Sequence, residues 1–308
     1  MQLVRAAPGR LEPLAAPVLQ PLPWAEARPN FLGRPVYYSD IVVRVGRPWR
    51  SLADLRGRSW AYNDPDSHSG YNVVRAALAR RGWTDGFFGR VVQSGYHQRS
   101  LRMVAAGEVD AAAIDCQVLA VELRDHPELR QRLNIIDALG PSTIQPLVAA
   151  GHLPAGLRAD LRAALAELPD DDEARERLAN GYIARLAPVT DADYDDIRAM
   201  LADVERGLAD LLAADDAFEE KRISPHGADA AIGGDGGQAV AEELPVNRHE
   251  PPLSCERDEV FDGGEVSSHV ARMTIGEELS HSPEANAMKG KRRTSIVNAV
   301  KNSVIDTL

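Results

Sequence analysis

The sequence contains little cysteine, no long apolar run and no excess of positive charge. Its two cysteines, Cys116 and Cys255, lie far apart and match no metal-binding or redox spacing. No apolar stretch is long enough to span a membrane as a helix. The formal net charge of −11 at pH 7 argues against a nucleic-acid-binding protein. We therefore expect no metal site, no cofactor and no nucleic-acid partner.

The N-terminus also lacks the features of a secretion signal. Residues 1–10 contain Arg5, Pro8 and Arg10, without the apolar core of about 7–15 residues that such a signal needs. As written, the chain is expected to stay in the compartment where it is made. Residues 1–34 are rich in proline, and within them Leu14–Leu19 is predicted to form one short strand.

The hydrophobic content of 44% is that of a chain with a folded core. From Val36 to Ala138, β-branched and aromatic segments alternate with segments whose apolar residues recur at helical spacing. This alternation predicts an α/β fold with a parallel or mixed sheet that helices cover on both faces. The predicted strands are 35–44, 59–62, 89–93, 109–115 and 133–138, and the predicted helices are 51–57, 69–82, a segment that ends at Gly107, and 116–124.

After residue 138 the sequence predicts a folded segment, then a polar segment, and finally a basic segment with an apolar pattern. A strand is expected over 144–150, followed by helices over 154–168, 170–180 and 191–214. Residues 217–293 are mostly polar and of low complexity, which predicts disorder. The basic cluster Lys289–Arg293 precedes an apolar-patterned segment, 294–308, which is either an amphipathic helix that docks on a partner or membrane surface, or a solvated tail.

A candidate anion site lies in the stretch Trp60–Tyr71, which runs from a predicted strand through an Asp-Pro turn into a helix. Ser67, Ser69 and Gly70 fall at the first turn of that helix. Backbone N–H groups have no intrahelical partner there, and the helix dipole favours negative charge. The alternative is that these residues form only a turn and a helix cap.

Two more polar residues, His97 and Asp115, also follow predicted strands directly. In open α/β sheets, ligands bind beyond the carboxyl ends of the strands, so the three polar sites are expected at one sheet edge. Each residue also has a structural interpretation. His97 makes only structural hydrogen bonds in that interpretation, Asp115 caps the helix over 116–124, and Tyr38 packs in the core. Tyr71 packs either across the cleft or within the lobe.

The ordered motifs resemble those of phosphate, phosphite and phosphonate solute-binding proteins of ABC transporters. The resemblance rests on five motifs: Y-S-D-I-V-V at 38–43, S-L-A-D-L-R-G at 51–57, N-D-P-D-S-H-S-G-Y at 63–71, S-G-Y-H-Q-R-S-L at 94–101 and G-E-V-D-A-A-A-I-D at 107–115. It implies a type II periplasmic-binding-protein fold, in which two α/β lobes close on a ligand. It also implies a periplasmic monomer that binds a small oxyanion, serves an ABC transporter permease and catalyses no reaction.

The same resemblance assigns the site residues. Ser67, His68 and Ser69, with Gly70 and Tyr71 beside them, lie where the family holds phosphonate oxygens. His97 matches the family's ligand-contacting histidine, Asp115 matches an acidic or polar residue at the end of the next strand, and Tyr38 or Ser39 lines the cleft. Asp115 could accept hydrogen bonds from the ligand or orient His97.

The chain departs from the family pattern at its ends. The expected division is a remnant of the first lobe at 1–36, the anion-binding second lobe at 37–145, a return to the first lobe at 146–216, and a disordered tail at 217–308. An incomplete first lobe and a missing signal keep two alternatives open. One is a cytosolic ligand sensor or interaction module on the same fold, and the other is an enzyme that uses His97 as a base and Asp115 to orient it.

Overall fold

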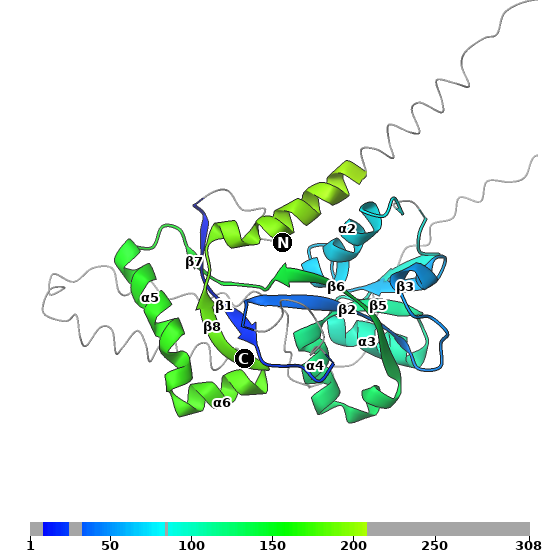
Figure 1. Ribbon diagram of the computed structural model, residues 1–308, viewed down its shortest axis with the longest axis horizontal. Coiled ribbons are helices and arrows are strands. Elements are labelled where there is room, and N and C mark those ends of the chain that lie inside the picture. Colours follow the sequence, from blue (N-terminus) through cyan, green and yellow to red (C-terminus); the bar gives the residue numbers. More distant parts are fainter. Residues whose placement is uncertain (1–8, 25–32, 84–85, 208–308) are drawn as a thin grey trace, which may run out of the picture. The chain divides into compact units, whose positions relative to one another are not determined.

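The computed structural model describes residues 9–24, 33–83 and 86–207, which form two β-sheets and the helices that cover them (Figure 1). The predicted disordered tail at 217–308 lies outside these residues. No helix within the described ranges has the length and apolar character needed to cross a membrane.

The larger sheet has five strands in the order β4-β3-β5-β2-β6. Three of them, β3, β4 and β5, are mutually parallel, and β2 pairs antiparallel with both β5 and β6. The predicted mixed sheet is therefore confirmed. Its strands are β2 (Val36–Arg44), β3 (Ser59–Tyr62), β4 (Arg90–Gln93), β5 (Ala111–Asp115) and β6 (Leu133–Thr143).

Helices cover both faces of this sheet. Alternate residues of β2 face opposite sides, so Ile41 and Val43 pack with α2 (Val73–Ala79), whereas Val42 packs with α3 (His97–Ala106) and α4 (Cys116–Asp125). Figure 1 shows α2 on one side and α3 and α4 on the other. Two short 3-10 helices, η1 (Leu52–Leu55) and η3 (Pro127–Gln131), complete this part of the chain.

The smaller sheet has three antiparallel strands in the order β7-β1-β8. They are β1 (Leu11–Leu19), β7 (Leu147–Ala150) and β8 (Ile183–Pro188), and they are covered by α5 (Ala155–Glu167), η4 (Leu168–Asp170) and α6 (Asp172–Asn180). Strand β8 is absent from the sequence-based prediction. Arginine and proline interrupt its alternation, and its burial depends on pairing with β1, which lies far earlier in the chain.

One helix packs against the cores of both sheets. After η5 (Asp191–Tyr194), a helix spans residues 195–207. Tyr194, the last residue of η5, and Ile197 of the helix lie in the core of the smaller sheet. Met200 and Val204 of the helix lie in the core of the larger sheet. The predicted helix over 191–214 is thus observed as far as residue 207, with a 3-10 first turn.

Candidate functional site

The candidate site begins where β3 leads into a helix. The first turn, η2 (His68–Asn72), is a π-helical turn that continues directly into α2. Ser67 is its N-cap, and the Ser67 hydroxyl accepts a hydrogen bond from the Gly70 backbone N–H at 3.1 Å. The predicted helix start is therefore correct to within one residue. Neighbouring first-turn N–H groups provide the positive end of the helix dipole.

Ser69 and His97 meet at the carboxyl ends of two neighbouring parallel strands. The Ser69 hydroxyl lies 2.9 Å from His97 Nε2, and Asn63 Nδ2 lies 3.5 Å from the same nitrogen. Ser67 joins the group through its hydroxyl, 3.5 Å from that of Ser69. Because β3 and β4 are adjacent and parallel, the residues that follow them arrive at one edge of the sheet.

Both histidines of the site are neutral at physiological pH. Burial lowers the pKa of His97 to about 4, although an interaction with the Ala113 backbone partly opposes the shift. Burial likewise lowers the pKa of His68 to about 3. The imidazoles therefore serve as hydrogen-bonding groups and contribute no positive charge.

Gly70 is required by close packing. A Cβ atom at this position would lie 2.0 Å from Asn63 Oδ1 and 3.1 Å from His97 Cε1. The backbone of the first turn therefore approaches the ends of β3 and β4 more closely than any side chain would allow. This close approach brings the first turn of η2 against His97.

His68 connects the helix start to β6 and β2. Its Nε2 atom lies 3.1 Å from the Ser142 hydroxyl, and its Nδ1 atom lies 3.3 Å from Asn72 Nδ2. Tyr37 on β2 packs edge-on against the His68 ring, with 6.4 Å between the ring centroids. Burial is the main reason that the pKa of Tyr37 is raised well above its usual value, and a hydrogen bond with Ser69 opposes the shift. Tyr37 thus lies against both His68 and Ser69.

Asp115 caps α4, as the structural interpretation predicted. Its carboxylate accepts hydrogen bonds from the Gln117 backbone N–H at 2.9 Å and from Gln145 Nε2 at 3.2 Å. Burial raises its pKa to about 6, against these two hydrogen bonds. Within the described residues no hydrogen bond joins Asp115 to His97, so Asp115 does not orient the imidazole. The predicted base–orienter pair is wrong.

Ser39 lies opposite Asp115 in the β2–β5 pairing. Its hydroxyl is buried, and it has no hydrogen-bond partner among the residues that the structure describes. Paired residues of neighbouring strands present their side chains on the same face of a sheet. Ser39 is therefore a hydroxyl on the same sheet face as the Asp115 carboxylate.

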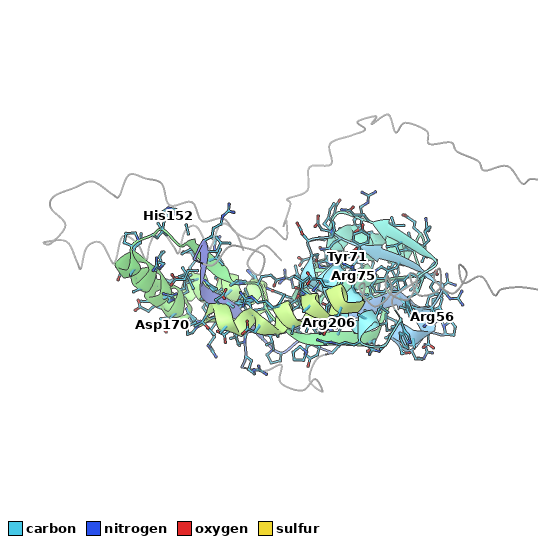
Figure 2. All side chains as sticks on the ribbon, turned by 90° about the horizontal axis from the view of Figure 1, so that it is seen from above. Arg56, Tyr71, Arg75, His152, Asp170 and Arg206 are labelled. Carbon is cyan, nitrogen blue, oxygen red and sulfur yellow. The ribbon has the colours of Figure 1, made fainter. Side chains whose placement is uncertain are left out.

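Two predicted site residues lie elsewhere. Tyr38 belongs to the core of the smaller sheet, and its backbone N–H donates to Cys116 Sγ at 3.4 Å. Tyr71 packs on Tyr62, with 4.8 Å between ring centroids, and under the Arg75 guanidinium (Figure 2). Tyr38 therefore lies in the core, as its structural interpretation predicted, whereas Tyr71 is partly exposed and packs within the larger-sheet part of the chain.

Three residues of the cluster were not predicted as site residues: Tyr37, Asn63 and Ser142. Neighbouring residues in a strand point to opposite faces, so Ser39 as a site residue indicates Tyr37, two positions away, rather than Tyr38. Asn63 opens the motif N-D-P-D-S-H-S-G-Y and could have been included on that ground. Ser142 follows the Gly140–Pro141 peptide bond, which is cis, and no local sequence signal indicates its contact with His68.

The chemistry of this cluster suits an oxyanion. It combines hydroxyls, amides, neutral imidazoles and the start of a helix, and these groups donate hydrogen bonds without adding a buried positive charge. No group of three or more His, Cys, Asp or Glu side chains in the described ranges is placed to hold a metal ion. Asp115 supplies an acceptor on the same edge of the sheet.

Comparisons with known proteins agree with this chemistry. A model of the periplasmic phosphonate substrate-binding proteins of ABC transporters matches residues 3–194, more than half of the chain. A solved structure similar to this chain is a binding-protein component of an ABC phosphonate transporter from Pseudomonas aeruginosa, at 22% identity and a TM-score of 0.55; the match covers 70% of this chain and 74% of that one. Another is PhnD1 from Prochlorococcus marinus in complex with methylphosphonate, at 18% identity and a TM-score of 0.52, with 62% and 70% of the two chains covered. These similarities show a periplasmic-binding-protein fold.

Proposed function

Because this chain belongs to the family of periplasmic phosphonate substrate-binding proteins of ABC transporters, we propose that it captures a small oxyanion for a transporter permease. The ligand class is phosphonate, phosphite or phosphate. Members of this family are transport binding proteins rather than enzymes. A likeness to a structure with methylphosphonate supports the ligand class without fixing the ligand.

The observation that carries this proposal is the convergence of Ser67, Ser69 and His97 at the start of η2. The two hydroxyls are 3.5 Å apart, and one of them is 2.9 Å from the imidazole. A tetrahedral oxyanion at this point would receive hydrogen bonds from hydroxyls and first-turn N–H groups. Its negative charge would be stabilised by the helix dipole rather than by a cation.

His97 then acts through Ser69. His97 Nδ1 has no hydrogen-bond partner among the described residues, so the imidazole makes its hydrogen bonds through Nε2, which in one tautomer accepts the Ser69 hydroxyl proton. Ser69 has one proton, so it donates either to His97 or to a ligand oxygen. On ligand binding, Ser69 turns its proton to the ligand, and a change of imidazole tautomer would let His97 donate to Ser69 in return.

In this proposal the two sheets correspond to the two lobes of the family fold. The larger sheet, about residues 37–145, carries the anion-binding groups, and the smaller sheet forms a reduced first lobe from 9–24 and 146–194. His68 and Ser142 lie near the end of β6, which leads into β7 of the smaller sheet. A ligand bound at η2 would therefore lie close to the connection between the lobes. The family assignment supports a periplasmic location for the protein, next to the permease.

The test is a thermal-shift screen of the full chain against phosphate, phosphite, methylphosphonate and 2-aminoethylphosphonate, with chloride and acetate at equal ionic strength as controls. A ligand at 100 times its dissociation constant adds about 2.7 kcal/mol to the free energy of unfolding. We expect at least one phosphorus oxyanion to raise the melting temperature and the two controls to leave it unchanged. The proposal would be rejected if none of the phosphorus oxyanions changed the melting temperature. The highest concentration tested is the one at which the ligand itself begins to change the ionic strength of the buffer.

A further inference from the structure

The edge of the larger sheet opposite the candidate site is rich in arginine. The parallel strands begin at this edge, and β2 ends there. Residues 44–58 contain five arginines and one acidic residue, and residues 44–102 contain 11 arginines and four acidic residues, in a chain whose net charge is −11. We define the arginine edge as the exposed residues Arg44, Arg47, Arg50, Arg56, Arg58 and Arg90.

These arginines surround one exposed apolar residue at the tip of a turn. Val45 follows the last residue of β2, and 51% of its surface is exposed. Its backbone N–H donates to the Arg132 carbonyl at 2.8 Å, and Gly46 after it has a φ of 87°, which makes the turn sharp. Val45 therefore projects from the sheet with an arginine on either side, Arg44 and Arg47.

Aromatic rings and backbone carbonyls hold the guanidinium groups in place. Arg47 and Arg58 both lie over the Trp49 ring, each 5.3 Å from its centroid. Arg56 lies 4.8 Å from the centroid of Phe87, and Arg50 donates to the Arg47 and Trp49 carbonyls at 3.1 and 2.9 Å. A fixed guanidinium loses less side-chain entropy when it binds an anion than a free one does.

Four acidic residues border this edge, and three of them are engaged in local structure. Asp54 accepts hydrogen bonds from the backbone N–H groups of Arg50 and Ser51 at the start of η1. Asp137 accepts from the backbone N–H of Leu52. Asp110 accepts from the backbone N–H and hydroxyl of Ser59, and it lies 4.0 Å from Arg47. Glu108, the fourth, is exposed beside Gly107. The six arginines still outnumber these carboxylates, so the edge stays positive.

We propose that the arginine edge docks on a membrane surface that contains anionic phospholipid. Clusters of four to eight basic residues beside an apolar contact have the sequence character of anionic-lipid binding, and each basic side chain near the surface contributes about a fivefold change in partition. Val45, exposed among these arginines, offers an apolar contact for the headgroup layer. The basic segment Lys289–Arg293 is a second cationic element in the same chain.

Docking at this edge leaves the candidate anion site free. Strands β3 and β4 run from the arginine edge to the candidate site, and their four residues each separate the two by about 13 Å. In Figure 2, Arg56 is well separated from Tyr71, which directly follows Gly70. The start of η2 therefore lies at the other end of the parallel strands from the surface that would contact lipid.

The test is co-sedimentation of the full chain with vesicles of pure phosphatidylcholine and vesicles of equal parts phosphatidylglycerol and phosphatidylcholine. We expect binding to the mixed vesicles alone, with release at high salt. Arg47→Glu with Arg50→Glu should lower the partition coefficient by about 30-fold or more. The matched control, Arg175→Glu with Arg177→Glu on α6, makes the same change of charge at two exposed arginines and should leave it unchanged.

Val45→Ser, which keeps the charge, should weaken binding severalfold, and it serves as a second variant if the charge reversal lowers the melting temperature. Three outcomes would overturn the proposal. One is equal binding to both vesicle types. Another is unchanged binding by the arginine-edge variants, which would assign the interaction to residues 289–308. The third is arginine-dependent binding to polyglutamate without binding to vesicles, which would indicate an acidic protein partner.

Discussion

The Ser69 hydroxyl lies 2.9 Å from Nε2 of His97, although 28 positions separate the two residues in the chain. Each residue lies at the start of a helix that follows a strand, and such a position can be predicted from the local sequence. Their contact depends on the pairing of β3 with β4. The predictions below test whether this contact and its surroundings have the roles that the geometry indicates.

Loss of the two serine hydroxyls should abolish oxyanion binding without unfolding the protein. Ser67→Ala removes an N-cap and should lower the free energy of unfolding by about 1 kcal/mol. Ser67→Ala combined with Ser69→Ala should also eliminate the thermal shift caused by the best phosphorus oxyanion. Ser51→Ala is the matched control, because Ser51 precedes η1 and bonds to Asp54 far from the site. A ligand shift that survives the double substitution would place the binding site elsewhere.

Gly70→Ala should destabilise the protein by about 1–3 kcal/mol, because the new methyl group would overlap Asn63 and press on His97. Gly156→Ala in α5 is the control, since nothing lies within 4 Å of a Cβ there, and it should be neutral or stabilise by up to about 1 kcal/mol. Chemical denaturation of both variants measures the difference. Equal stabilities would show that η2 can move away from Asn63 at little cost.

His97 should make the protein sensitive to acid. Its pKa is about 4 in the folded chain and 6.5 in an unfolded one, so between these values the unfolded state binds more protons. Stability from this group is therefore complete above pH 6.5 and is lost as the pH falls toward 4, by up to about 1.4 kcal/mol per pH unit. Asp115 acts in the opposite direction, because burial raises its pKa from 3.8 to about 6.

His97→Asn should flatten this pH dependence, and urea denaturation between pH 4 and 7 measures it. The comparison variant is His126→Asn, at a partly exposed residue after α4. Parallel stability curves for His97→Asn and the unmodified chain would mean that His97 is not buried as a neutral group. His68, whose pKa is about 3, should retain part of the acid sensitivity in either case.

The helix over 195–207 should contribute to stability through Met200 rather than through its surface ion pair. Met200→Ala removes a buried side chain from the core of the larger sheet and should cost about 2–5 kcal/mol. Arg80→Ala removes a half-exposed partner that lies 2.6 Å from Asp203, and such pairs contribute about 0–1 kcal/mol. Thermal unfolding of the two variants should rank them in this order, and the reverse order would make the ion pair the main contact.

Much of the larger sheet could be predicted from the sequence, because most of its strands contain β-branched or aromatic residues and end in recognisable caps and turns. Ser67 as a cap and Gly107 at the end of α3, with a φ of 84°, illustrate such local rules. The position of His97 beside Ser69 followed from strand alternation and sheet topology. The motif resemblance added the family, which the match over residues 3–194 confirms.

What could not be predicted depends on contacts between distant segments. β8 is stabilised by pairing with β1, and its own six residues give little signal. Strand alternation from Ser39 favours Tyr37 over Tyr38, but the contact of Tyr37 with the His68 ring has no signal in the sequence. The role of Asp115 as the cap of α4 could be predicted, but its second hydrogen bond, from Gln145 in the segment after β6, has no signal in the local sequence.

The helix over 195–207 sets a condition on any movement of one sheet relative to the other. Tyr194 and Ile197 are anchored in one core, and Met200 and Val204 are anchored in the other, about one helical turn further along. A hinge between the lobes would therefore have to bend this helix between residues 197 and 200 or pull one of its ends free. A shortened chain that stops before residue 200 would lack both Met200 and Val204 and would lose that brace.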